Sequence, residues 1–348
     1  MKIEELIKNL DIPKQFLEKV LDTAKTIDFS SHQSDIRALC KAESASRAYA
    51  ALLRALGEDA DGVKIFTAEL FAALQTYENY RNMGIDDKIY YDTMGAMRRR
   101  LYESYTEEGC WIFDRSSWAI HHISMSLFRI GALEYQLTSK YGEDVIAVHI
   151  PSDADLSNED LDRSFADARQ FFRTYYPWAG DLRIVCESWM LSQRLPKILK
   201  DGSEILNFQS RFHIEFTREG ESRVRRVFRI SECGLSDINM HTLPEETSLR
   251  RAIKEIYKVG GSIGEGYGIY KENEHIGALR PGKYRHYKGN MYELIGTAKH
   301  SETLEDTVIY RALYADGELW VRPAYMWEQL VKTESGHIPR FEFAENDR

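Results

Sequence analysis

The segment AVHIPSDADLSNEDLDRSF, which runs from Ala147 to Phe165, decides how the middle of this chain folds. An apolar strand end is followed by His-Ile-Pro, a short acidic loop and the start of a helix. Ser157 and Asp160 form a capping box at the helix start. Free backbone N–H groups at such a helix start bind anionic cofactors, but Asp153 and Asp155 stand where a phosphate loop favours glycine. The loop is therefore either a cofactor site or only a turn.

The segments on both sides predict further strands and helices around this unit. Strand-like residues occupy Phe128–Leu137 and Asp144–Pro151, and a buried type of strand occupies Asp181–Leu191. A short helix then leads to a strand hairpin around Glu219–Gly220. The order of strand, strand, helix, strand, helix, strand, strand predicts an α/β arrangement on a mixed sheet. We expect this domain to span residues 118–275.

The first part of the chain has the pattern of successive helices. Apolar residues recur at helical spacing, and Gly84 and Gly109 each follow a helix. Residues 34–57 have the pattern of one long amphipathic helix that ends at Gly57. We expect a helical N-terminal region over residues 1–117, so that the whole chain is a multidomain protein of the α+β or α/β class.

From Pro281 the sequence changes to short strands of alternating polarity. Asp316–Leu319 marks a hairpin, and about 65 residues of short strands are enough to close a small barrel. We expect this β-barrel domain at residues 279–348. The glycines at 261–268 follow a helix instead of opening one, which favours a helix C-cap and a flexible turn over a phosphate loop.

The net charge of the chain and the spacing of its cysteines exclude several classes of protein. The formal net charge of -9 argues against a general nucleic-acid binder, because neutralising phosphates takes a basic surface. None of the 4 cysteines lies near another, and His121–His122 lack a third ligand at recognisable spacing, so we expect no metal site. No stretch approaches the roughly 18 apolar residues of a membrane span. We expect a cytoplasmic protein with no membrane or nucleic-acid partner.

Two families are recognisable in these segments. The region from Trp118 to Gly268 resembles an N-acyltransferase-like family of the GNAT superfamily, in which a helical part precedes a GNAT-like part. The resemblance is carried, in this order, by LFRIGALEYQL, VHIP, SFADARQFF, CESWML, SEILNFQSRF and LPEETSLRRAI. The tail, GKYRHYKGNMYELIGTAKHSETLEDTVIYRALYADGELWVRPAYMW, resembles a small bacterial domain family of unknown function, for which we expect an SH3-like fold.

The first resemblance implies transfer of an acyl group from acetyl-CoA or another acyl-CoA to the amine of a small molecule or peptide. The backbone of the strand that ends at His149 would hold the pantetheine, and the following loop and helix start would face the pyrophosphate. The strand with Cys186 and Glu187 would splay away to open a slot for the thioester. The cofactor contacts implied in this way are Val148, Ile150, Ser152, Leu156, Ser157, Asn158, Cys186 and Ser188.

Acyl transfer to an amine needs a base that takes up the amine proton. His149 is the first candidate because histidine titrates near neutral pH, and a histidine that only fixes the loop is the alternative. Glu187 is the second candidate, since it alternates with Val185 and faces either the cleft or a nearby arginine. Cys186 is more typical of a small buried residue than of a nucleophile. Trp118 is more typical of a core than of a substrate platform.

A rival hypothesis from a different class is a GNAT-shaped binding or scaffold protein without catalysis. The missing glycine loop favours it, whereas VHIP, CESW and the element order favour the enzyme. In the tail, Arg285, His286, His300 and Arg322 lie among tyrosines. They either line a binding groove or satisfy the turns of the barrel itself, and we favour the second interpretation. The sequence does not indicate a partner for the barrel.

Overall fold

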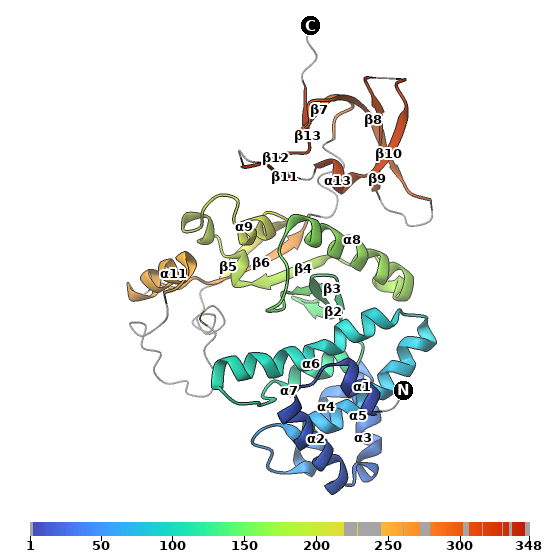
Figure 1. Ribbon diagram of the computed structural model, residues 1–348, viewed down its shortest axis with the longest axis vertical. Helices are drawn as coiled ribbons and strands as arrows, with labels where there is room; N and C mark the ends of the chain where they lie inside the picture. The colour runs from blue at the N-terminus through green and yellow to red at the C-terminus, as the bar shows by residue number, and fades with distance from the viewer. Residues whose placement is uncertain are drawn as a thin grey trace.

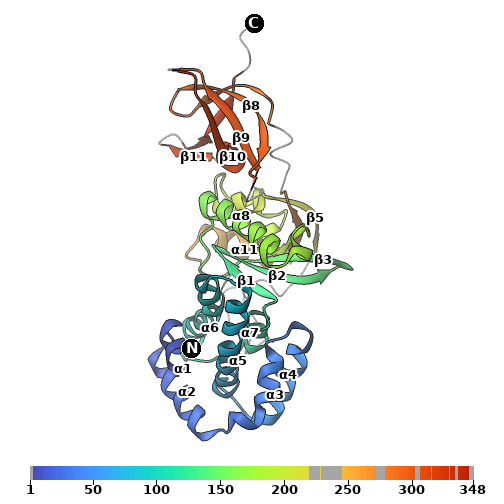
Figure 2. The same cartoon turned by 90° about the vertical axis from the view of Figure 1, so that its right-hand side faces the viewer.

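A computed structural model shows the chain as three parts that follow one another along its long axis (Figure 1). Helices lie at the N-terminal end, a mixed sheet lies in the middle, and an antiparallel sheet lies at the C-terminal end. A quarter turn of the molecule shows the same order (Figure 2). The structure describes residues 3–218, 228, 245–259, 261–271, 279–301, 306–314, 316–328, 330–333 and 336–344.

The predicted helical N-terminal region is confirmed. Its α-helices are α1 (Ile3–Asn9), α2 (Lys14–Thr26), α3 (Gln33–Leu39), α4 (Ala42–Leu56), α5 (Val63–Met83), α6 (Asp87–Glu108) and α7 (Ser116–Ile123). Helix α5 is buried on several sides, because its buried residues are spread around its circumference. None of the helices in the described ranges combines the length and apolar character that a membrane crossing demands.

The prediction of one helix over residues 34–57 is wrong, because the structure breaks it between α3 and α4. Lys41 has an extended backbone, with φ -125° and ψ 125°. The hydroxyl of Ser44 donates to the carbonyl oxygen of Ala38 over 2.8 Å, and the same oxygen accepts from the N–H of Lys41 over 3.3 Å. At the other end of the region, α7 extends to Ile123, past the expected boundary at residue 117.

The middle part is a six-stranded mixed sheet in the order β1-β2-β3-β4-β6-β5. Its strands are β1 (Leu127–Ile130), β2 (Leu133–Lys140), β3 (Glu143–His149), β4 (Ile184–Ser188), β5 (Phe212–Arg218) and β6 (Glu265–Tyr270). Strands β3 and β4 are parallel and are joined by α8 (Asn158–Tyr175), as a parallel pair requires, while the other neighbours are antiparallel. The predicted mixed sheet with flanking helices is confirmed.

Two sequence predictions about strands need correction or stay open. Phe128–Leu137 is not one strand, since it is divided into β1 and β2 by a turn at Gly131, whose φ is +62°. A Cβ at Gly131 would lie 3.1 Å from the Cβ of Ser164, so glycine lets this turn rest on α8. The hairpin around Glu219–Gly220 lies outside the described residues, and the described partner of β5 is β6.

The glycines at 261–268 have two separate roles. The N–H of Gly261 donates to the carbonyl oxygen of Ile256 over 2.9 Å at the end of α11 (Ser248–Lys258), which confirms the predicted C-cap. The flexible turn is wrong for Gly266 and Gly268, which lie in β6. A Cβ at Gly266 would be 2.2 Å from the carbonyl oxygen of Leu191, so a 3-10 turn packs directly across this strand.

The main hydrophobic core is continuous between the helical part and the sheet. Phe165 and Phe172 of α8 share it with Tyr135 and Ile146 of the sheet and with the buried side chains of the N-terminal helices. On the opposite face of the sheet, the described residues form a small apolar cluster around Val185. Helices α6 and α7 reach this second face near β1 and β2, where polar side chains gather.

The C-terminal part contains an open antiparallel sheet in the order β10-β9-β8-β7-β13. Its elements are β7 (Gly282–His286), β8 (Met291–Lys299), β9 (Asp306–Ala312), β10 (Leu319–Pro323), α13 (Ala324–Glu328), β11 (Leu330–Thr333), β12 (Gly336–Pro339) and β13 (Phe341–Phe343). The hairpin at Asp316–Leu319 is confirmed by the pairing of β9 with β10. Within the described ranges β10 and β13 do not pair with each other, so the predicted closed barrel is not seen.

Candidate active site

His149, the predicted base, lies at the end of β3 among polar side chains from β2 and α7. Sheet register places it directly opposite Glu134, with Gln136 as its diagonal neighbour. The Nε2 atom of His149 lies 2.9 Å from Oε1 of Gln136. The indole of Trp118 meets the His149 ring edge to face, with ring centroids 4.8 Å apart. The Trp118 residue is 38% exposed, so the expectation that it is core is wrong.

Burial sets the protonation state of His149. It lowers the pKa of the ring from 6.5 to about 4, and the nearby carboxylate of Glu134 acts in the opposite direction. Burial also lowers the pKa of His121 on α7. His149 is therefore uncharged at neutral pH, which a proton acceptor requires, although so low a pKa makes it a weak base.

Glu134 is the centre of a buried group of charges beside this histidine. It is 3% exposed, its Oε1 atom lies 3.5 Å from Nε2 of His122, and it accepts a short hydrogen bond from Arg99 of α6. Burial on its own would raise its pKa, but His122 and Arg99 hold the pKa of Glu134 well below its usual range. The carboxylate is therefore charged, and helices α6 and α7 supply its partners.

The acidic loop after β3 is held against α6 and β1 through its own side chains. Asp153 lies 2.8 Å from Nη1 of Arg129 and 3.5 Å from Nη1 of Arg99. Both arginines lower the pKa of Asp153, against the effect of its partial burial. Ser152 donates to a carboxylate oxygen of Glu103 over 2.5 Å. The charge of Asp153 is thus already compensated, which removes much of its repulsion toward a phosphate.

Ser157 is the N-cap of α8, but the predicted capping box is wrong, because the N–H of Ser157 donates to Asp155 and the carboxylate of Asp160 lies 3.4 Å from Nη1 of Arg163. The hydroxyl of Ser157 accepts from the N–H of Asp160 over 3.4 Å, and Asp155 accepts from the N–H of Ser157 over 2.8 Å. The side-chain oxygen of Asn158 accepts from Arg211 over 3.0 Å. The side chain of Leu156 is buried in the main core. Two amides at this helix start therefore already have acceptors from the chain itself.

The parallel pairing of β3 and β4 stops before both strands end. The last paired residues are Val148 and Cys186, whereas Glu187 and Ser188 continue the ladder only with β6. Val148 and Cys186 belong to the main core on the α8 side, and burial raises the pKa of the Cys186 thiol. No residue after this pair is in register between β3 and β4, while β4 continues paired with β6 to Ser188, as the predicted slot requires.

The remaining predicted site residues have partners within the protein. Glu187 accepts from Lys140 over 3.1 Å and from the hydroxyl of Tyr141 over 2.9 Å. These bonds hold the pKa of Glu187 below its usual value despite its partial burial, so it is a poor base at neutral pH. The hydroxyl of Ser188 caps the following turn at the N–H of Met190. Ile150 packs against the main core.

Sequence reasoning missed Arg99, Glu134 and Gln136. The signal for the last two was present, because in LEYQ two polar residues alternate with Leu133 and Tyr135, which face α8. Arg99 gave no such signal, since its partner is distant in sequence. Among the described residues no group of three or more His, Cys, Asp or Glu side chains is arranged to hold a metal ion.

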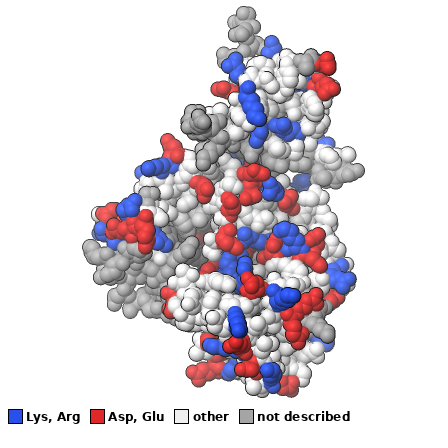
Figure 3. All heavy atoms as spheres, viewed as in Figure 1, with Lys and Arg blue, Asp and Glu red and all other residues white. Residues whose placement is uncertain are grey.

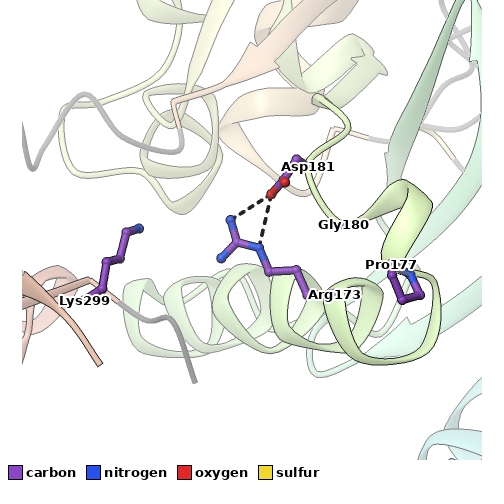
Figure 4. Close-up of a pocket in the computed structure, with 5 residues that line it drawn as sticks. All are labelled: Arg173, Pro177, Gly180, Asp181 and Lys299. Carbon is purple, nitrogen blue, oxygen red and sulfur yellow. Dashed lines mark hydrogen bonds and ion pairs between the residues drawn. The ribbon is translucent and has the colours of Figure 1, made fainter. Parts of the chain in front are cut away.

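A cavity of about 360 Å³ lies elsewhere, beside the C-terminal end of α8. It is lined by Arg173, Pro177, Gly180, Asp181 and Lys299 (Figure 4). Arg173 and Asp181 form an ion pair of 3.0 Å there. The cavity shares no lining residue with the His149 group. On the face of the molecule in Figure 3, basic and acidic side chains are interspersed over the described parts.

In the C-terminal part, Phe341 brings two of the four noted polar residues together. The His286 ring lies 4.8 Å from the Phe341 ring and the Arg322 guanidinium lies 5.5 Å from it. Trp327 stacks on the same ring at 3.8 Å. Within the described part of the chain, Nη1 of Arg322 and Nε1 of Trp327 are buried without a hydrogen-bond acceptor. Among the described residues of this domain, these two donors are therefore unsatisfied.

Three family comparisons cover most of the chain. Residues 1–125 match the N-acyltransferase N-terminal domain, and residues 127–270 match the GNAT-like C-terminal domain. Residues 282–343 match the family described as protein of unknown function (DUF1653). Among curated proteins, none matches this chain.

Solved acyltransferase structures share the fold of the helical part and the middle sheet. An acyltransferase in complex with decanoyl-CoA and teicoplanin is 19% identical, with a TM-score of 0.64 over 77% of this chain and 86% of that chain. An acyltransferase mutant in complex with octanoyl-CoA is 19% identical, with a TM-score of 0.64 over 77% and 87%. A Bordetella bronchiseptica protein of the DUF1653 family is 39% identical over 20% of this chain and 91% of that chain, with a TM-score of 0.19. The chain therefore joins the two domains of a GNAT-like N-acyltransferase to a C-terminal domain of the DUF1653 family.

Proposed function

We propose that this protein transfers an acyl group from an acyl-CoA to the amine of a small molecule or peptide, with His149 as the base. The observation that carries the proposal is the end of β3–β4 pairing at Val148 and Cys186, next to an uncharged histidine. The two acyltransferase domains support the reaction class, and the relatives bound to decanoyl-CoA and octanoyl-CoA support a long acyl chain as a donor to test first.

The proposed reaction exchanges one bond to the acyl carbon for another. The amine nitrogen bonds to the thioester carbonyl carbon, the bond from that carbon to sulfur breaks, and the thiolate leaves. His149 takes the proton that the nitrogen loses, which leaves a neutral amide product, and the thiolate then takes up a proton. Backbone groups of β3 beyond Val148 would hold the pantetheine, and the loop at 150–157 would face the phosphates.

The phosphate end of this proposal depends on residues that compensate the acidic loop. Arg99 and Arg129 neutralise Asp153, so the loop adds less negative charge than its sequence predicts. Replacing Asp153 with glycine would remove the ion pairs with Arg99 and Arg129 and would also make the loop backbone more flexible. The structure therefore favours measuring binding on the unaltered loop.

The direct test combines binding with turnover. Calorimetry with acetyl-CoA and decanoyl-CoA on the full chain measures donor affinity, and release of free thiol with a panel of primary amines measures transfer. We expect decanoyl-CoA to bind and His149→Ala to lower turnover by roughly 100-fold or more, with donor affinity unchanged. Ser139→Ala, which removes a hydroxyl bonded to Asp144 at an exposed position, is the control.

A second candidate function is a scaffold that keeps the GNAT shape without catalysis. It is favoured by the start of α8, where chain groups already cap the amides of Ser157 and Asp160. Failure of both acetyl-CoA and decanoyl-CoA to bind would contradict acyl transfer and leave this candidate. Donor binding with turnover unaffected by His149→Ala would contradict only the assigned base.

A further inference from the structure

Gln136 lies between two histidines on the polar face of the sheet. Its Oε1 atom is 2.9 Å from Nε2 of His149, and its Nε2 atom is 3.3 Å from Nδ1 of His121. Trp118 meets both rings edge to face, with centroids 4.8 Å from His149 and 5.1 Å from His121. Three side chains from α7, β2 and β3 thus form one hydrogen-bonded row under a single indole.

An amide group has chemically different ends, so its direction fixes where the ring protons lie. The oxygen of Gln136 only accepts, and the neighbouring His149 nitrogen must therefore carry a proton. A neutral imidazole has one proton, so Nδ1 of His149 then holds the lone pair. At the other end the amide nitrogen donates, which leaves Nδ1 of His121 as an acceptor.

We infer that Gln136 is a positioning residue that holds the proton of His149 on Nε2 and presents Nδ1 to the attacking amine, an inference that rests on the proposed function. An uncharged amide suits this task. The groups around His149 already include Glu134 and Lys140 from β2 and His121 and His122 from α7. A carboxylate in place of the amide would also accept from Nε2, but it would stabilise the charged ring.

The sheet holds Gln136 in place for this role. The residue is 8% exposed and stands opposite Ala147, whose small side chain leaves space above the neighbouring strand. Its side chain bonds at both ends, so it cannot turn over without changing both histidines. The tautomer of His149 therefore depends on Gln136 and His121 as well as on His149 itself.

Nitrogen-15 spectra of the full chain with labelled histidine report the proton directly. His149→Gln identifies the signal of His149 among the 10 histidines. At pH 7 we expect Nε2 to be protonated and Nδ1 to be bare. Gln136→Leu should give a mixture of the two tautomers and lower kcat by about 10-fold, with KM for decanoyl-CoA nearly unchanged. Gln136→Glu should keep the proton on Nε2 and move the pH midpoint of His149 upward.

Gln209→Leu is the matched control for a purely structural glutamine. Gln209 is 7% exposed, and its Nε2 atom donates to the carbonyl oxygens of Met190 at 3.1 Å and Ser192 at 2.8 Å. Its loss should lower Tm and leave the His149 signals unchanged. An unshifted tautomer in Gln136→Leu, or a His149 proton on Nδ1 in the parent chain, would overturn the inference.

The two proposals fail separately. The spectra need neither donor nor acceptor, so a proton that leaves Nε2 in Gln136→Leu supports the role of Gln136 in the resting protein. No acyl transfer with any donor and amine pair would contradict the proposed reaction alone. Transfer by Gln136→Leu at the parent rate would contradict the positioning role even if the tautomer moved.

Discussion

A charged side chain of the middle sheet and one of the C-terminal sheet differ in the partners that their buried atoms find. In the middle sheet, Glu134 is buried between His122 and Arg99, so its charge has partners. In the C-terminal sheet, Arg322 lies against aromatic rings, and its buried Nη1 atom has no hydrogen-bond acceptor in the described part of the chain. Removing a partner of a buried charge destabilises the protein, whereas a buried donor without an acceptor lowers the stability of the domain that contains it.

The helical region adds a third case, in which the unpaired group is able to neutralise itself. Glu69 of α5 is 0% exposed, and neither carboxylate oxygen has a hydrogen-bond partner among the described residues. Burial raises its pKa well above 4.5. A carboxyl group escapes the cost of a buried charge by binding a proton, and an arginine does not, because it stays charged.

Breaking the pairs of Glu134 should give the largest effect. Arg99→Leu leaves a buried carboxylate with only His122, and we expect it to lower the free energy of unfolding by about 3–5 kcal/mol. Adding Glu134→Gln to Arg99→Leu should restore most of that loss. Urea denaturation measures both variants.

Arg98→Leu is the matched control for the Arg99 experiment. Arg98 pairs with Asp11 at 3.3 Å on the surface, and its side chain is 43% exposed. It should change the free energy of unfolding by less than about 0.5 kcal/mol. If Arg98→Leu and Arg99→Leu lower the free energy of unfolding equally, the buried pair of Arg99 with Glu134 contributes no more than a surface pair.

Titrating Glu69 sharpens the contrast between an acid and an arginine. The folded chain holds the Glu69 proton above pH 4.5 while the unfolded chain loses it, so stability falls as pH rises through that range. Each unit by which the pKa is raised corresponds to about 1.4 kcal/mol. Glu69→Gln should flatten this slope in denaturation curves measured from pH 5 to pH 8, and should be more stable than the parent at pH 8. An unchanged slope would show that Glu69 has a compensating partner.

Removing the buried Nη1 donor of Arg322 should give the smallest effect and the opposite sign to the Arg99 experiment. Arg322→Met keeps a flexible side chain beside Phe341 and removes the buried donor, so we expect a gain of about 1 kcal/mol in stability. Arg285→Met, at an exposed position of β7, should change little. Thermal unfolding of the full chain measures both. A loss of stability in Arg322→Met would mean that its contacts with the rings of Tyr310 and Phe341 outweigh its unpaired donor.

The sequence predicted the parts of this molecule that depend on local pattern. The N-cap at Ser157, the strand that ends at His149 and the mixed sheet all follow from periodicity and capping chemistry, whereas the capping-box bond from Asp160 does not form. The division of residues 34–57 was missed because the extended backbone of Lys41 and the bond from Ser44 to Ala38 interrupt a stretch whose apolar spacing is helical throughout. The spacing of apolar residues does not show where a helix ends when a side-chain hydrogen bond helps to form that end.

The candidate site was only half predictable for the same reason. His149 is visible because of its place after a strand, but its partner Gln136 is visible only once β2 and β3 are in register. The acidic loop appeared repulsive because the arginines that neutralise Asp153 come from α6 and β1. Ion pairs between segments that are distant in sequence can be identified only when the fold is known.

Because β6 lies between β4 and β5 in the sheet, these two strands are synthesised before the strand that joins them. Strand β5 ends at Arg218, and among the described residues its partner in the sheet is β6, which ends at Tyr270. At about 5–20 residues per second of synthesis, the ribosome takes on the order of 3–10 s to cover the distance between them. During that interval β4 presents an unfilled edge and β5 has no described neighbour. Gly266 and Gly268 therefore belong to the last described strand of this sheet to be synthesised, and without side chains they leave the room in which Leu191 packs across it.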